Sequence, residues 1–382
     1  MPPRGIPTLQ LRHAVVTVLV VFGTRPEAIK LAPVIRALHQ RSAEFRVRVC
    51  VTGQHRQMLD SVLHLFAITP DYDLNLMQPN QSLCHTASSV LQHLEPVLRQ
   101  VRPDWVIIQG DTTSVAAAAL AAFYCEARVA HVEAGLRTYD KHQPFPEEIN
   151  RRVASVIADL HFAPTERARQ NLLREGIPAH TIHVTGNTIV DALHWIVQHS
   201  PPASPLLDGV LADEKPLVLI TAHRRENFGR GLEDICLAVR ELAQQFPQVR
   251  FVYPVHLNPN VRAPAYRLLR DIPNVTLTDP LDYATMAHLL RRATLVLTDS
   301  GGIQEEAPTF GKPVLVLREI TERPEVVEAG VARLVGTDRA RIVAETTRLL
   351  TDPEAYARMA HAVNPYGDGR AAERIADILA RL

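Results

Sequence analysis

Short apolar runs rich in β-branched residues recur along this chain and constrain its fold more than any other feature. Segments with a helical pattern separate them. The runs cover residues 15–22, 47–52, 105–109, 127–132, 160–163 and 181–185 in the first half, and 217–221, 250–255, 275–278, 295–298, 313–317 and 332–335 in the second. Strands this apolar are typical of parallel sheets that are covered on both faces and built from βα repeats. The sequence therefore predicts an α/β fold with two consecutive, doubly wound units.

The chain length and the segments outside the runs indicate how these units are organised. At 382 residues the chain is too long for one ordinary core, so two domains are expected. Residues 198–216 are rich in proline and lack a hydrophobic period, which predicts a loop near the domain boundary. The final segment, residues 369–382, has the period of an amphipathic helix, and the period does not say which domain this helix packs against. Its apolar face comprises Ile375, Ile378, Leu379 and Leu382.

The composition argues against several classes of protein. Lys plus Arg equals Asp plus Glu, 41 against 41, so no global charge favours nucleic acid or an anionic membrane. The 4 cysteines are scattered, and the 17 histidines show no metal-site spacing, so we expect neither a disulfide framework nor a metal. No segment reaches the roughly 18 apolar residues that span a bilayer. We therefore expect a soluble, cytoplasmic protein without nucleic-acid or membrane partners.

Polar residues follow several strands of the first half, where ligands of open α/β sheets bind. Arg25 and Lys30 follow the first run, and the pattern there fits either an anion site or a capped helix with surface charges. Asp111, Glu133 and Glu147 follow later runs. Asp111 could instead cap a helix, and Glu147 could complement a helix dipole. Three carboxylates in neighbouring loops nevertheless suit acid–base chemistry on one substrate.

Cationic residues follow the first strand of the second half. His223, Arg224 and Arg225 follow residues 217–221 after a single alanine. This arrangement before a predicted helix favours a diphosphate ligand over a purely structural role.

A glycine turn with acidic residues behind it follows residues 295–298. Ser300 or Asp299 can cap a helix that begins near Gly301 and Gly302, whose N–H groups suit a phosphate. Helical side chains lean towards the N-terminus, so Glu306 can reach past that phosphate to the hydroxyls of a ribose. Its neighbour Glu305 faces elsewhere, and we expect it to be an ordinary surface charge.

A set of motifs, together and in order, resembles the non-hydrolysing bacterial UDP-N-acetylglucosamine 2-epimerases. The resemblance runs from about residue 15 to the C-terminus. The motifs are VFGTRPEAIKLAPVI (21–35), VTGQHRQMLD (51–60), DYDLNLM (71–77), GDTTS (110–114), HVEAGLRT (131–138), PFPEEINRR (144–152), VTGNTIVDAL (184–193), TAHRREN (221–227) and LTDSGGIQEEAPTFGKPVLVLREITERPE (297–325).

The resemblance implies a fold and a reaction. The fold would be GT-B-like, with two Rossmann-like domains, the active site in the cleft between them, and the last helix returning to the first domain. The N-terminal domain would then comprise residues 14–190 and 366–382, and the UDP-binding C-terminal domain residues 191–365. UDP-N-acetylglucosamine and UDP-N-acetylmannosamine would interconvert by anti-elimination of UDP, through a 2-acetamidoglucal, and syn re-addition. This chemistry, which serves cell-envelope polysaccharide synthesis, requires no NAD, metal or other cofactor, and family members are commonly homodimers.

The resemblance also carries roles to individual residues. Asp111, Glu133 and Glu147 match the acid–base carboxylates of the family, and His223 matches its catalytic histidine. Arg25 and Lys30 match cations of the family's cleft, and Ser300, Gly301 and Glu306 match its UDP-binding set. Which of the three carboxylates acts on C2 stays open.

Two departures from the family pattern concern binding. Met286 stands where some relatives have an aromatic residue that can stack on uracil, and a Met can also pack flat against a base. Gln54, His55 and Gln57 match a region in which several relatives bind a second UDP-N-acetylglucosamine as an activator. Asn80 replaces an Arg of the regulated members, which leaves allosteric activation open.

Three alternatives compete with the epimerase. A GT-B glycosyltransferase would use the same grip on a UDP-sugar, but it does not explain the HVEAGLRT and PFPEEINRR carboxylates together. A hydrolysing epimerase usually carries a kinase domain, for which the chain has no length. A nucleotide-sugar sensor has no need of three carboxylates around one sugar.

Overall fold

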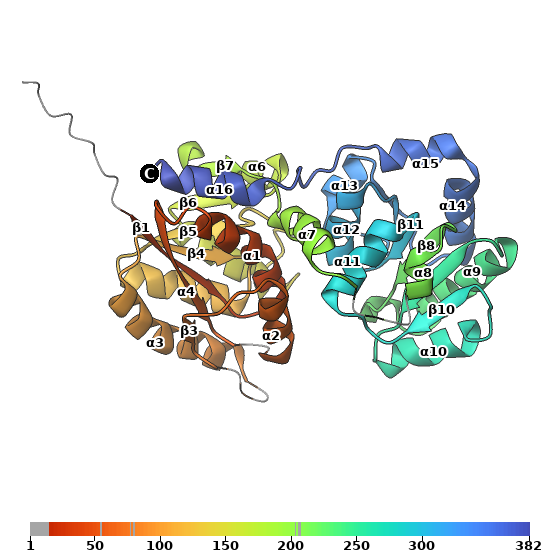
Figure 1. Ribbon diagram of the computed structural model, residues 1–382, viewed down its shortest axis with the longest axis horizontal. Coiled ribbons are helices and arrows are strands. Elements are labelled where there is room, and N and C mark those ends of the chain that lie inside the picture. Colours follow the sequence, from red (N-terminus) through yellow and green to blue (C-terminus); the bar gives the residue numbers. More distant parts are fainter. Residues whose placement is uncertain (1–14, 54–55, 77, 79–80, 203, 205–207) are drawn as a thin grey trace, which may run out of the picture. The chain divides into compact units, whose positions relative to one another are not determined.

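The computed structural model describes residues 15–53, 56–76, 78, 81–202, 204 and 208–382, in two compact units. The first contains the described residues up to Phe162, Gly176–His183 and Ala372–Leu382, and the second contains Ala163–Glu175 and Val184–Ala371. Each unit is built on one sheet (Figure 1). The prediction of an α/β fold with two Rossmann-like units, as in GT-B proteins, is confirmed.

The first sheet has seven strands in the order β3-β2-β1-β4-β5-β6-β7. They are β1 (Val16–Phe22), β2 (Phe45–Val51), β3 (Tyr72–Asp73), β4 (Trp105–Gln109), β5 (Arg128–Val132), β6 (Leu160–Ala163) and β7 (Ile182–Val184). The pairs from β3 to β6 are parallel, with Val18 opposite Val47 on one side and Trp105 on the other. All six predicted runs are strands. The sequence missed β3, whose two residues are too short to show an alternating pattern.

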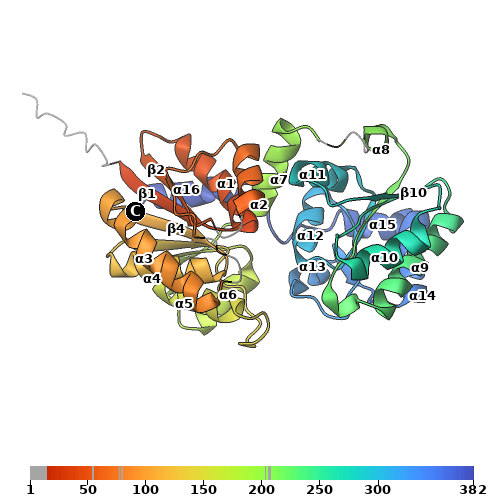
Figure 2. The same ribbon diagram turned by 90° about the horizontal axis from the view of Figure 1, so that it is seen from below.

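Helices cover both faces of this sheet. They are α1 (Arg25–His39), α2 (Arg56–Leu65), α3 (Leu83–Val101), α4 (Thr113–Tyr124), α5 (Glu147–Ile157) and α16 (Ala371–Ala380). α3, α4 and α5 lie on one face, while α1 and α16 lie on the other (Figure 2). In α16, Ile375 and Leu379 are buried as predicted, whereas Leu382 lies beyond the helix end and is 64% exposed. An ion pair between Arg41 and Asp377 ties α16 to the end of α1.

The second sheet repeats the plan with six strands in the order β10-β9-β8-β11-β12-β13. They are β8 (Leu217–Thr221), β9 (Arg250–Pro254), β10 (Val275–Thr278), β11 (Leu295–Thr298), β12 (Val314–Val316) and β13 (Ala332–Leu334), and all of them pair in parallel. The α-helices among the residues of this unit are α6 (Glu166–Arg174), α7 (Thr188–His199), α8 (Asp208–Ala212), α9 (Arg230–Gln245), α10 (Pro259–Leu269), α11 (Tyr283–Arg292), α12 (Gly301–Glu306), α13 (Pro324–Glu328), α14 (Arg339–Thr351) and α15 (Pro353–Ala360). Residues 198–216, predicted as a loop, include the short helix α8.

His131 shows how tightly the first sheet packs next to its loops. This residue of β5 is fully buried, and its Nε2 donates a hydrogen bond of 2.8 Å to the carbonyl oxygen of Gly110. Its Nδ1 has no hydrogen-bond partner in the described part of the chain. Burial lowers the pKa of His131 from 6.5 to about 3, because a charged imidazole would lose its hydration there. A neutral His131 therefore holds the loop after β4.

We predict that His131 makes the fold sensitive to acid. Between pH 6.5 and about 3 the unfolded chain binds a proton at this residue and the folded protein does not, so the free energy of unfolding falls as the pH falls. The variant His131→Gln should flatten this dependence by about 1.4 kcal/mol per pH unit below about pH 6. Urea unfolding at pH 7, 6 and 5 measures both slopes. The exposed His180→Gln variant is the control, and equal slopes for wild type and His131→Gln would contradict the prediction.

Candidate active site

A buried carboxylate joins two loops where the strand order of the first sheet reverses, between β1 and β4. Glu27 Oε2 accepts hydrogen bonds from the backbone N–H groups of Gly23 (2.6 Å) and Thr24 (3.1 Å). Its Oε1 accepts one from the hydroxyl of Thr112, at 2.7 Å. Burial, the largest influence, raises the pKa of Glu27, while these hydrogen bonds act in the opposite direction. The loops after β1 and β4 are therefore held together by one side chain.

The same contacts bear on the capped-helix interpretation of the turn after β1. Free N–H groups at the start of α1 would suit an anion, but the carboxylate of Glu27 already occupies them, as in a capping box. Arg25, the first residue of α1, is half-buried. The structure therefore shows a capped helix at this turn, with the N–H groups of Gly23 and Thr24 bound by Glu27.

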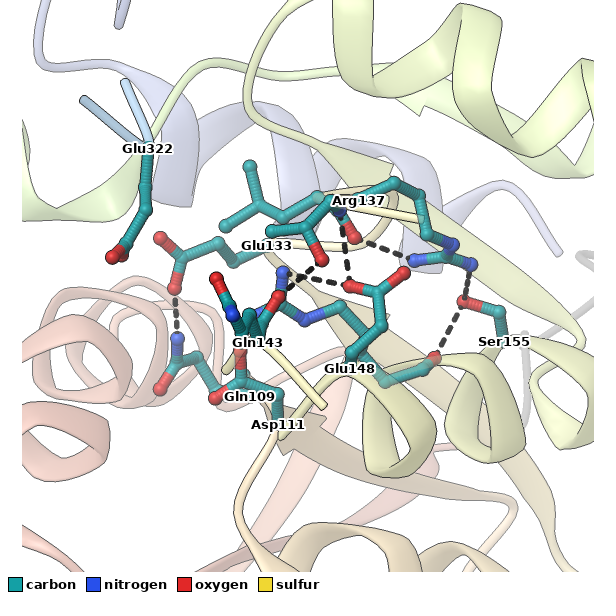
Figure 3. Close-up of polar contacts among 12 residues, drawn as sticks. Gln109, Asp111, Glu133, Arg137, Gln143, Glu148, Ser155 and Glu322 are labelled. Atoms are coloured by element: carbon teal, nitrogen blue, oxygen red, sulfur yellow. Dashed lines mark hydrogen bonds and ion pairs between the residues drawn. The ribbon is translucent and has the colours of Figure 1, made fainter. Parts of the chain in front are cut away.

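Glu133 is held in an unusual conformation at the end of β5. Its φ of 63° lies in the left-handed region, which a residue with a long side chain rarely adopts. Lys30 Nζ lies 2.5 Å from its Oε1. The Gln109 side chain donates a hydrogen bond to its Oε2, as Figure 3 shows. The side chains of Lys30 and Glu133 are only 13% and 6% exposed. Lys30 is thus paired with a carboxylate, and strain is concentrated at a candidate catalytic residue.

Asp111, which follows β4, forms an ion pair instead of capping a helix. Its Oδ2 lies 2.5 Å from Nη2 of Arg151, and Nη1 of the same guanidinium lies 3.4 Å from Glu148 Oε2. The helix-cap interpretation of Asp111 is wrong, because the Thr112 hydroxyl caps α4 by accepting from Val115 N–H at 3.3 Å. Arg151 therefore orients the carboxylate of Asp111.

The two glutamates that begin α5 have different environments. Glu148 is fully buried and accepts hydrogen bonds of 3.1 Å from the N–H groups of Thr138 and Tyr139. Glu147 is half-buried, and among the described residues its side chain forms no hydrogen bond or ion pair. Glu147 is therefore available to a ligand, although its place in the first turn also suits the helix dipole.

A second buried carboxylate joins the loops after β8 and β11, where the strand order of the second sheet reverses. Asp299 accepts hydrogen bonds from His223 N–H (2.9 and 3.0 Å to its two oxygens), Arg224 N–H (2.8 Å) and the Asn227 amide (3.0 Å). The expectation that Asp299 or Ser300 caps α12 with its side chain is wrong. Ser300 occupies the N-cap position without a side-chain cap bond, and Asp299 binds the other loop.

The glycine turn at the start of α12 lies between a cation and a carboxylate. A Cβ atom on Gly301 would lie 3.5 Å from an Nη atom of Arg224, and a Cβ atom on Gly302 would lie 4.0 Å from Glu306 Oε1. Glu306 is buried and accepts a 3.2 Å hydrogen bond from the Tyr283 hydroxyl. The helix geometry thus brings Glu306 back to its own N-terminus, as the sequence predicts.

The ring of His223 lies beside two titratable groups. Its Nδ1 is 3.6 Å from Asp299 Oδ1, which is too long for a hydrogen bond but close enough for electrostatic attraction. The imidazole of His256 stacks on it, with ring centroids 5.7 Å apart and planes 15° from parallel. Burial is the largest influence and lowers the pKa of His223, Asp299 raises it, and His256 and Arg224 lower it further.

Glu305 is not the surface charge that its place in the sequence predicts. It is buried and forms an ion pair of 2.5 Å with Arg323. Its neighbour Gln304 accepts a 2.5 Å hydrogen bond from the Thr321 hydroxyl. The buried face of α12 therefore anchors the loop after β12 through polar contacts.

The remaining predicted residues are the one expected at the uracil and those of the region expected to bind an activator. Met286 is half-buried on α11, one turn after Tyr283. Gln54, His55 and Asn80 lie outside the described residues, and Gln57 lies in α2 with a side chain that is not described.

Sequence reasoning missed several groups that hold the candidate residues in place. These are Gln109, Arg151, Tyr283 and, in its actual role, Asp299. A usable signal existed for Tyr283, because a spacing of three residues puts it on the same helix face as Met286. The partners of the other three are distant in sequence, so no local pattern identifies them.

Comparison with known proteins places these residues in a family. The family described as UDP-N-acetylglucosamine 2-epimerase matches residues 36–380. A Yersinia pestis UDP-N-acetylglucosamine 2-epimerase is 54% identical over 364 residues, which cover 94% of this chain and 96% of the relative. The chain belongs to the UDP-N-acetylglucosamine 2-epimerase family. The resemblance seen in the motifs is thereby confirmed.

Solved structures of the family share the whole fold. One from Listeria monocytogenes, described as a UDP-N-acetylglucosamine 2-epimerase, is 46% identical with a TM-score of 0.91, and 96% of each chain is covered. The Neisseria meningitidis UDP-GlcNAc 2-epimerase, solved with UDP-GlcNAc bound, is 48% identical with a TM-score of 0.85, covering 96% of this chain and all of that one. A glycosyltransferase structure at 14% identity shares the fold alone, so the glycosyltransferase alternative is the weaker one.

Membrane-spanning helices and metal sites are two further features that the described residues can reveal. No described helix is long and apolar enough to cross a bilayer. Within the same residues, no group of three or more His, Cys, Asp or Glu side chains is arranged to hold a metal ion.

We predict that Glu27 contributes strongly to stability through the three donors that it satisfies. Glu27→Ala leaves two buried N–H groups without their acceptor and should lower the free energy of unfolding by about 1–3 kcal/mol. Glu27→Gln keeps the shape and one acceptor oxygen, and its amide can donate to the Thr112 hydroxyl, so its loss should be smaller. Urea unfolding measures both changes. The exposed Glu44→Ala variant is the control, and a Glu27→Ala variant as stable as this control would contradict the prediction.

Proposed function

We propose that the protein interconverts UDP-N-acetylglucosamine and UDP-N-acetylmannosamine by epimerisation at C2. The observation that carries the proposal is Glu133, a candidate acid–base carboxylate held between Lys30 and Gln109 in a strained backbone. Fixed orientation of a reacting group is a large part of enzymatic rate enhancement. Membership of the epimerase family and the relatives' names support the same substrate pair.

The reaction divides between departure of UDP and proton transfer at C2. In the proposed sequence, the C2 proton is removed as the C1–O bond to UDP breaks in anti fashion, which gives 2-acetamidoglucal and UDP. Syn re-addition of UDP at C1, with a proton delivered to C2, gives the epimer. We assign proton transfer to Asp111, Glu133 and Glu147, since each transfer needs a carboxylate within reach of the sugar.

We assign the groups of the second unit to UDP, which is the leaving group of the substrate. Arg224 and His223 supply cationic groups, and the backbone of Ser300, Gly301 and Gly302 supplies N–H donors for the developing charge of the diphosphate. Arg224 already lies beside the glycine turn. We assign Glu306 to the ribose hydroxyls, and Met286, on the helix that also carries Tyr283, to the uracil face. Arg25 remains a candidate for substrate binding from the first unit.

Exchange of the C2 proton tests the proposed reaction. In deuterated water with UDP-N-acetylglucosamine, proton NMR should show loss of the C2–H signal and formation of UDP-N-acetylmannosamine. Asp111→Asn and Glu133→Gln should slow exchange by about 100-fold or more while UDP still binds, because each removes an acid–base group. Glu44→Gln, at an exposed ion pair with Arg41, should behave as wild type. A retained C2–H signal without the epimer would rule out the reaction.

We also infer that the protein is a cytoplasmic homodimer. The cysteines that the structure describes are all free, which suits a reducing compartment. Ile149, Val153 and Val156 form one face of α5 and are 43%, 37% and 81% exposed. Phe123 and Tyr124 at the end of the neighbouring α4 are 62% and 65% exposed. An apolar surface of this kind supports association with a second copy.

A single charge should separate the proposed subunits. Val156→Asp puts a carboxylate on the exposed face of α5, where burial in an interface would strip its hydration. Light scattering after size-exclusion chromatography should give the dimer mass for wild type and the monomer mass for the variant. Val363→Asp, at an equally exposed position (81%), is the control and should remain dimeric. A monomeric wild type, or a dimeric Val156→Asp variant, would refute the interface.

A further inference from the structure

Asp299 is a buried acid without a direct part in the proposed chemistry. It lies directly after β11 and has no exposed surface, yet within the described part of the chain its carboxylate accepts its hydrogen bonds from the loop that follows β8. A buried charge of this kind is costly unless it is fully hydrogen-bonded. The contacts therefore indicate a specific task.

The first part of that task is geometric. The N–H groups of His223 and Arg224 both point at the carboxylate, and the Asn227 amide, which also donates to the Leu317 carbonyl oxygen at 3.1 Å, completes the set. Two consecutive N–H donors on one carboxylate fix the orientation of the peptide between them. The starting directions of the His223 and Arg224 side chains follow from that orientation.

The second part is electrostatic. Asp299 Oδ1 lies 3.6 Å from His223 Nδ1, so its negative charge favours a proton on the imidazole. The other groups that face this ring act in the opposite direction. His256 stacks on the ring from the end of β9, and Arg224 is its neighbour in the chain. Burial, the largest influence, and these two neighbours lower the pKa of His223, and Asp299 is the group that acts against them.

We propose that Asp299 is a positioning residue for His223 and Arg224: its carboxylate orients their shared peptide and supplies the charge against which His223 takes up a proton. The proposal rests on the proposed function in one respect, namely that His223 and Arg224 act on the departing diphosphate. A protonated His223 can then donate to the diphosphate as negative charge develops on it.

The experiment follows the protonation of His223 directly, so that its outcome does not depend on the activity. The Cε1–H resonances of ¹³C-histidine-labelled full-length protein are recorded from pH 5 to 9, and the His223→Asn variant assigns the signal. In Asp299→Asn, the His223 midpoint should move to lower pH, because the charge that favours the imidazolium is lost. In Asn227→Ala the charge remains, so the midpoint should stay or move to higher pH. Asp279→Asn, at an exposed ion pair with Arg262 in the same unit, should change nothing.

Kinetics test the link to the reaction. In Asp299→Asn, kcat for epimerisation should fall at least about tenfold, since misplacement of a reacting group can cost on the order of 100-fold. An unshifted His223 midpoint in Asp299→Asn would overturn the proposal. A move of the midpoint to lower pH in Asn227→Ala would also overturn it, because the ordering of the loop, and not the charge of Asp299, would then set the protonation of His223. The Asn227→Ala titration decides the question even if Asp299→Asn does not fold. An inactive wild type with the expected midpoints would refute the proposed function and leave the role of Asp299 intact.

Discussion

A buried carboxylate at the point where the strand order reverses is the interaction on which both candidate sites depend. Reversal of strand order leaves two loops side by side, and their backbone N–H groups have no partners in the sheet. In the first unit Glu27 satisfies such groups and reaches the loop after β4. In the second, Asp299 satisfies the corresponding groups after β8 from the loop after β11. In both units a buried acid satisfies these N–H groups. Glu27 follows the same strand, β1, as the groups that it binds, whereas Asp299 follows the neighbouring strand, β11.

The consequence for chemistry is that candidate residues sit on loops with little freedom. Thr112, which Glu27 binds, is the neighbour of Asp111, whose carboxylate is held by Arg151. Glu133 is held by Lys30 and Gln109. Because Asp111 and Glu133 have defined partners, their orientation before substrate arrives is fixed, and little reorganisation is needed at the moment of reaction. Lys30 and Arg151 of the first unit bind its carboxylates, whereas Arg224 of the second lies beside a glycine turn that suits a phosphate.

The strands were predictable because their signal is local. A buried parallel strand must be apolar along its whole length, so each one is visible as a run, and only β3, with two residues, escapes. The reach of Glu306 back to Gly302 was also predictable, since it follows from helix geometry within six residues. The roles of Glu305 and Asp299 were misjudged because their partners, Arg323 and the loop of His223, lie outside the helix α12 and its start. The packing of the sheet, and not helix geometry, brings these partners into contact.

Local pattern and motif spacing were therefore enough to specify two Rossmann-like units, the loops that carry polar residues, and the family. They could not specify which charges are paired. Lys30 reads in sequence as a cation for a phosphate, and only the meeting of α1 with the end of β5, a separation of 103 residues, reveals that it holds Glu133. Secondary structure is governed by neighbours within a few residues, whereas an ion pair depends on where the folded chain places side chains that are far apart in sequence.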